Sequence, residues 1–118
     1  MGKVRTFFGI LKLELQDAAD DAAVLIEAAR MKQAEGTYTE YVTRENTALY
    51  RIEIDSLGDL VREISDREGN TFESIDEAIS AVREITSLKI REWNYPALIT
   101  GLLDRKIEKA LKYLDTGA

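Results

Sequence analysis

The stretch that decides the fold runs from Phe7 to Met31 and reads FFGILKLELQDAADDAAVLIEAARM. Apolar side chains recur here every three or four residues, which places them on one broad face of an α-helix. The pattern predicts a helix over about residues 3–35 that is buried on more than half of its circumference, so it needs neighbours on two sides. Gly36 is its expected stop.

Residues 37–55 leave two alternatives open. Apolar residues recur at helical spacing from Tyr38 onward, which predicts a second helix over about residues 39–66. Tyr50 and Ile52 also alternate with charged residues, as in a strand, so the alternative is an α+β fold with a β-hairpin at about 37–55. We favour the helix, because its pattern persists over roughly 25 residues and a lone hairpin is marginally stable.

Two further helices follow. Ser74 with Glu77 three residues later fits the capping-box pattern, which predicts a helix over about residues 74–92. Pro96 disfavours helical geometry in the residue before it and is well suited to a first helical turn. The last helix is therefore expected over about residues 97–115.

The four helices predict an all-α fold, an antiparallel four-helix bundle in a single domain over residues 1–118, with a longer N-terminal helical pair. The length mismatch leaves apolar surface that a single chain does not cover, so we expect a homodimer. The residues expected at that interface are Phe7, Leu11, Leu25, Tyr38 and Tyr41.

The composition of the chain excludes several classes of function. The formal charge of −6 argues against broad binding to nucleic acid, which needs clustered Lys and Arg. No apolar run is long enough for a membrane span, and no signal-peptide pattern is present, so we expect a cytoplasmic protein that does not bind membranes. The absence of Cys and His excludes disulfides, thiolate and imidazole metal sites, and a Ser-His-Asp triad.

One acidic cluster suggests chemistry. Glu14, Asp17 and Asp21 are three and four residues apart, which places them on one side of the first helix, within its apolar arc. Glu45 and Glu53 lie on the apolar arc of the second helix. Hard cations such as Mg²⁺ or Mn²⁺ prefer convergent oxygen ligands, so these five acids form a candidate metal site for phosphoester or phosphoanhydride hydrolysis.

This arrangement distantly resembles the all-α nucleotide pyrophosphohydrolases, which bind Mg²⁺ through acidic residues on two helices of a bundle. Their pattern pairs an E-x-x-E element with a later E-x-x-D element. Here the first element is Glu14-x-x-Asp17, and no well-spaced E-x-x-D follows on the second helix, so no family residue is transferred. The resemblance implies a Mg- or Mn-dependent nucleotide pyrophosphohydrolase as the alternative function.

Acidic residues beside a helix interface more often pair with a basic residue of a neighbouring helix, such as Lys89 or Lys106. No coherent catalytic set accompanies the acids. The leading prediction is therefore a small acidic helical bundle without a cofactor or an evident catalytic site, which acts by self-association or by binding a protein partner.

Overall fold

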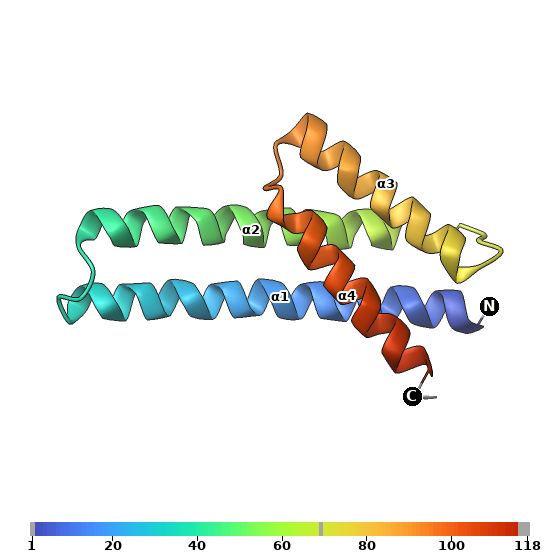
Figure 1. The fold of residues 1–118 in the computed structure, drawn as a ribbon, viewed down its shortest axis with the longest axis horizontal. Helices are drawn as coiled ribbons and strands as arrows, with labels where there is room; N and C mark the ends of the chain where they lie inside the picture. The colour runs from blue at the N-terminus through green and yellow to red at the C-terminus, as the bar shows by residue number, and fades with distance from the viewer. Residues whose placement is uncertain (1, 69, 116–118) are drawn as a thin grey trace.

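The computed structural model describes residues 2–68 and 70–115, and it is an all-α fold of four helices in the order α1 to α4 (Figure 1). The helices are α1 (Gly2–Ala34), α2 (Glu40–Arg67), α3 (Ile75–Trp93) and α4 (Leu98–Asp115). Each lies within about two residues of its predicted range, and the longer N-terminal pair is confirmed. No described helix is long and apolar enough to cross a membrane.

The β-hairpin alternative at 37–55 is wrong, because the described residues contain no strand and Glu40–Arg67 is one continuous helix. Thr39 decides where this helix starts. Its hydroxyl accepts a hydrogen bond from the backbone N–H of Val42 at 3.1 Å, which satisfies a donor that the first helical turn leaves unpaired. The strand-like alternation covers only a few residues, whereas the helical pattern continues for the length of α2.

Local signals also explain the other helix boundaries. The turn after α1 contains Gly36 at φ 84°, a left-handed conformation that glycine adopts without steric cost. The hydroxyl of Ser74 accepts the N–H of Glu77 at 3.1 Å, so the predicted cap of α3 is confirmed. At the other end of α3, Asn94 takes a left-handed conformation and turns the chain toward Pro96.

The helices are arranged as a long antiparallel hairpin of α1 and α2 with a shorter pair laid across one half of it. Figure 1 shows α4 crossing the face of the hairpin and α3 beside α2, while the loop end of the hairpin extends beyond both. The molecule measures 54 × 33 × 19 Å. The two long helices therefore have different neighbours along their length.

The hydrophobic core lies where all four helices meet. Its largest fully buried side chains come from every helix and include Phe7, Phe8, Leu11, Leu15, Leu57, Leu60, Ile64, Val82, Ile99, Leu103 and Ile107.

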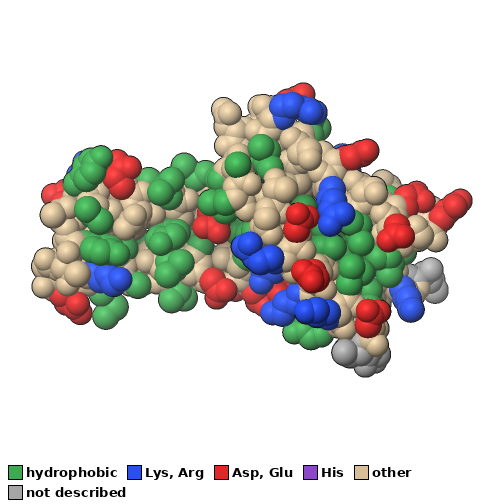
Figure 2. All heavy atoms as spheres, in the orientation of Figure 1, with side chains coloured by type: hydrophobic (Ala, Val, Ile, Leu, Met, Phe, Trp, Pro, Cys, Tyr) green, Lys and Arg blue, Asp and Glu red, His purple; other side chains and the backbone are tan. Residues whose placement is uncertain are grey.

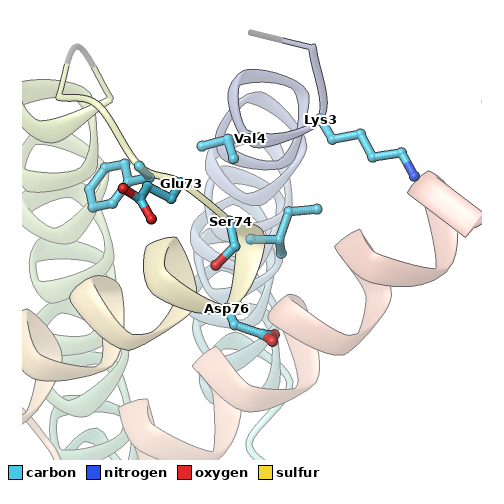
Figure 3. Close-up of a pocket in the computed structure, with 7 residues that line it drawn as sticks. Lys3, Val4, Glu73, Ser74 and Asp76 are labelled. Carbon is cyan, nitrogen blue, oxygen red and sulfur yellow. The ribbon is translucent and has the colours of Figure 1, made fainter.

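The entry into α3 is anchored to the start of α1. The ring of Phe72 packs against the ring of Phe8, with centroids 5.6 Å apart. Beside it, Val4, Ser74 and Asp76 line part of a shallow hollow between the first turns of α1 and α3 (Figure 3). This contact fixes the short helical pair to the N-terminal half of α1.

Candidate interaction surface

We call residues 20–53 the distal hairpin, because the shared core of the domain ends just before them. On α1 the core reaches Ala19, and on α2 its last partly buried member is Ile54. Beyond these residues only α1, α2 and their loop are present, as Figure 1 shows. The distal hairpin therefore has two helices where the rest of the molecule has four.

The seam between the two helices of the distal hairpin is made mostly of small residues. Its buried side chains are Ala22, Ile26 and Ala29 on α1, and Thr43 and Thr47 on α2. Both threonine hydroxyls donate to backbone carbonyls of the preceding turn, so neither is left unsatisfied. Small side chains let the helices approach closely, but they bury little apolar area.

The large apolar side chains of the distal hairpin lie outside this seam. Of the twelve large apolar residues that are exposed in the described chain, seven belong to residues 20–53. Figure 2 shows hydrophobic side chains spread along this protruding part of the molecule. The seven are Val24, Leu25, Met31, Tyr41, Val42, Leu49 and Ile52.

Part of this surface is organised as two stripes on one face. On α1, Asp21, Leu25, Ala28 and Lys32 are spaced four, three and four residues apart, which keeps them within about 60° of one another around the helix. Leu25, Ala28 and Lys32 line one shallow hollow together with Asn46 of α2, so both helices contribute to the same face.

The α2 stripe has the same spacing and consists of Val42, Asn46, Leu49 and Glu53. Spacing of three and four is the pattern with which a helix packs lengthwise against another helix. The two stripes therefore share the spacing with which helices pack lengthwise.

Ion pairs fasten the shorter helices to the other half of the hairpin. The carboxylate of Glu14 is buried and lies 3.2 Å from the Nζ atoms of both Lys106 and Lys109 of α4. Burial alone would raise the pKa of Glu14, but the hydrogen bonds and charges of the two lysines outweigh it, so the pKa is below its ordinary value. Glu14 is thus held as a carboxylate in the α1–α4 contact.

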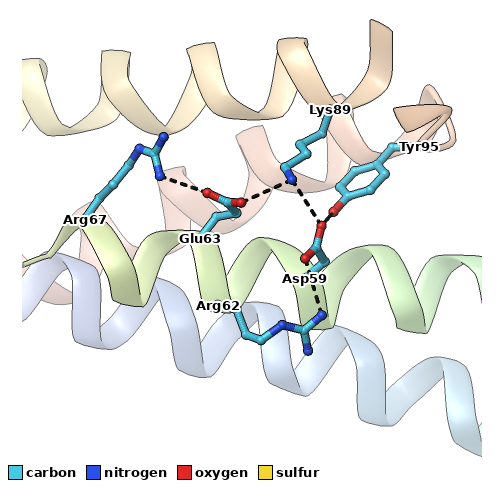
Figure 4. Close-up of polar contacts among 6 residues, drawn as sticks. All are labelled: Asp59, Arg62, Glu63, Arg67, Lys89 and Tyr95. Carbon is cyan, nitrogen blue, oxygen red and sulfur yellow. Dashed lines mark hydrogen bonds and ion pairs between the residues drawn. The ribbon is translucent and has the colours of Figure 1, made fainter. Parts of the chain in front are cut away.

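A second polar cluster joins α3 to α2 (Figure 4). The Nζ atom of Lys89 lies 3.1 Å from Glu63 and 3.5 Å from Asp59, and the Tyr95 hydroxyl donates to Asp59. The Tyr95 hydrogen bond is the main reason that the pKa of Asp59 is lowered. The pKa of Tyr95 is raised, first by burial and then by Asp59, so the phenol stays protonated and remains a donor.

The five acids predicted as a metal site are not gathered in one place. Glu14 is paired with α4, while Asp17, Asp21 and Glu45 are exposed and Glu53 is half-buried. Within residues 2–68 and 70–115, no group of three or more acidic side chains is placed to hold a metal ion. The pairing with Lys106 that the sequence suggested for an acid of this cluster is present.

The five predicted interface residues fall into two groups. Phe7 and Leu11 are fully buried in the core of their own chain. Leu25 and Tyr41 are exposed, and Tyr38 is half-buried beside Leu25 at the loop end of the hairpin.

Sequence reasoning did not single out Val42, Leu49 and Ile52 as interface residues, although they lie on the apolar side of α2. The available signal was the run of small residues that leads along α1 into the distal hairpin, which reads DAADDAA from Asp17. Small residues in the seam imply that larger ones lie elsewhere.

Comparison with known proteins gives no relative: no family model, no curated protein and no solved structure matches this chain.

Proposed function

We propose that this protein is a self-association module that acts through its distal hairpin. The observation that carries the proposal is the inverted distribution of side chains there: small residues in the seam, and seven large apolar residues on the outside. Contiguous exposed apolar surface on a folded domain marks a binding site. Burial of that surface by a partner supplies the free energy that the seam alone does not.

The mode of action is binding rather than catalysis. The polar clusters at Glu14 and Asp59 are occupied by lysine and tyrosine partners that hold the helices together. The exposed apolar surface has no such intramolecular role, and this supports a partner outside the chain.

Light scattering coupled to size exclusion tests the proposal. The chain has a mass of 13.3 kDa, and we expect a species of twice that mass at micromolar concentration. A monomer at this concentration would overturn self-association.

A matched pair of variants locates the surface. Leu49 in the distal hairpin and Leu13 in the other half of α1 are almost equally exposed, at 64% and 67%. Leu49→Asp should convert the dimer to a monomer, whereas Leu13→Asp should leave it dimeric. Circular dichroism checks that both variants keep their helical content. The opposite result would move the interface away from the distal hairpin.

A further inference from the structure

We infer that the partner of the distal hairpin is a second copy of this chain lying antiparallel and face to face, with Asp21 opposite Lys32 of the partner subunit. The inference rests on the proposed self-association and adds the orientation and register of the two copies. It is carried by three properties of the stripe face, which we define as the α1 stripe Asp21, Leu25, Ala28 and Lys32 with the α2 stripe Val42, Asn46, Leu49 and Glu53.

The first property is continuity with a contact that the fold already makes. Glu14 lies seven residues before Asp21, so it is on the same stripe one position beyond Ala18, and α4 binds it through Lys106 and Lys109. On α2 the stripe continues from Glu53 to Ser56, which is buried. The same face is therefore covered by helices near the core and uncovered in the distal hairpin, and helices are the shape of partner that it fits.

The second property is self-complementarity. In a two-fold contact, residue i meets residue j and residue j meets residue i. If the α1 helices of two copies run antiparallel, the register that puts Leu25 against Ala28 of the partner subunit also puts Asp21 against Lys32 of the partner subunit. A large side chain then meets a small one, and an acid meets a base, twice in each dimer.

The centre of the α2 stripe lies at the same height along the hairpin axis as the centre of the α1 stripe. Ala34 and Glu40 flank the loop, so the point midway between Leu25 and Ala28 on α1 lies beside the point midway between residues 46 and 49 on α2. The same two-fold axis therefore places Leu49 against Asn46 of the partner subunit. The same operation places Val42 against Glu53 of the partner subunit, so one axis brings both stripes into register.

Charge supports this register. Within the described part of the chain, neither Asp21 nor Lys32 forms an ion pair of its own. The ammonium of Lys32 lies over the ring of Tyr38, 5.0 Å from its centroid, which holds it at the loop end of the hairpin. Exposed ion pairs select orientation more than they add affinity.

The third property is steric. α4 crosses one side of the α1–α2 hairpin (Figure 1), and its ion pairs with Glu14 show that this is the side of the stripe face. Two copies facing each other in the same direction would bring their α4 helices together and hold the distal hairpins about two helix diameters, roughly 20 Å, apart. In the antiparallel arrangement, each distal hairpin instead fits beside the α4 helix of the other copy.

Disulfide crosslinking tests the register, and the chain has no cysteine of its own to interfere. Asp21→Cys and Lys32→Cys are prepared as separate single variants, and light scattering first confirms that each forms a dimer. We expect a disulfide-linked species in an oxidised mixture of the two variants and not in either variant alone. In the antiparallel register two copies of residue 21 lie eleven positions apart along the helix axis, about 16 Å, which is too far for a disulfide.

The outcomes separate this inference from the proposed function. Linkage within the Asp21→Cys variant alone would place the two copies of residue 21 side by side, as in a parallel dimer or a different antiparallel register, and would overturn the inference while self-association stands. Dimers without linkage in the mixture would also overturn it. Monomers by light scattering for the unmodified chain would overturn the proposed function itself.

Charge reversal at Asp21 and Lys32 is a second, independent test of their pairing. Asp21→Lys should raise the dimer dissociation constant about three- to tenfold, since it places like charges together twice in each dimer, and adding Lys32→Asp should restore it. Asp20→Lys is the matched control, because Asp20 is equally acidic and exposed but points away from the stripe face. Failure of the double variant to recover would contradict the pairing.

Discussion

The two halves of the α1–α2 hairpin differ in what covers them, although the same two helices form both. In the half nearest the termini, α3 and α4 complete a four-helix core, and large side chains such as Phe8 and Leu60 are fully buried. In the distal hairpin, large side chains such as Leu49 are exposed and small ones occupy the seam. The comparison shows that the same two helices bury their large side chains only where α3 and α4 cover them, and this difference is the basis of the proposed self-association.

The two halves should differ most in the unfolding free energy that is lost when a leucine is replaced by alanine. Leu60→Ala should lower the free energy of unfolding by about 2–5 kcal/mol, because it leaves a cavity among four helices. Leu49→Ala should change it by less than about 1 kcal/mol at a concentration where the chain is monomeric. Urea unfolding followed by circular dichroism measures both. Equal losses would show that the halves are packed alike.

Replacing the lysines of α4 that contact Glu14 should have the next largest effect on stability. Lys106→Ala should cost about 1–3 kcal/mol of unfolding free energy, because the buried Glu14 carboxylate loses a charged donor. Lys109 is at the same distance from Glu14, but half of its side chain is exposed, so Lys109→Ala should cost under about 1 kcal/mol. Thermal or urea unfolding of the two variants separates them. A larger loss at Lys109 would contradict this account of the α1–α4 contact.

The half with four helices should also be the pH-sensitive one. The pKa of Glu14 is below its ordinary value of 4.5, so its contribution to stability is present above that value and is lost as pH falls through the lowered pKa. Asp59, whose pKa is lowered from 3.8, acts in the same direction at more acidic pH. We expect the melting temperature of the unmodified chain to fall between about pH 5 and pH 3.

The control for this pH dependence is Glu14→Gln, which removes the titrating group at that site. Its melting temperature should fall less steeply over the same range than that of the unmodified chain. Identical slopes would show that the Glu14 contact does not contribute to acid sensitivity.

Adding a divalent metal ion should have the smallest effect on the melting temperature. Glu14 is paired with α4, and the other four predicted ligands are not gathered around it, so millimolar Mg²⁺ or Mn²⁺ should shift the melting temperature by less than about 1 °C. A larger shift that disappears in a Glu14→Gln, Asp17→Asn variant would support the hydrolase alternative instead.

Much of the architecture was predictable because its signals are local. Thr39, Ser74 and the Trp93–Pro96 corner act within one helical turn, so the ends of the helices follow from neighbouring residues. The mismatch between the long and short helical pairs was predictable for the same reason. The ambiguity at residues 37–55 arose because a few alternating residues satisfy both periodicities, and only the longer pattern distinguishes them.

The candidate site was less predictable. Periodicity shows which face of a helix is apolar, but not what covers that face, so Phe7 and Leu25 looked equivalent in the sequence. In the structure Phe7 is in the core and Leu25 is exposed. Similarly, the spacing of Glu14, Asp17 and Asp21 indicates one side of a helix, yet among the described residues only the first of them forms ion pairs with α4.

The sequence by itself determined four helices, their lengths and their ends, because caps, glycines, the proline and apolar spacing all act over a few residues. Only the tertiary structure decided where the short helical pair lies along the long one. That placement depends on contacts between residues far apart in the chain, such as Lys106 with Glu14 and Phe72 with Phe8. It is this placement that buries one half of the long hairpin and leaves the other half exposed.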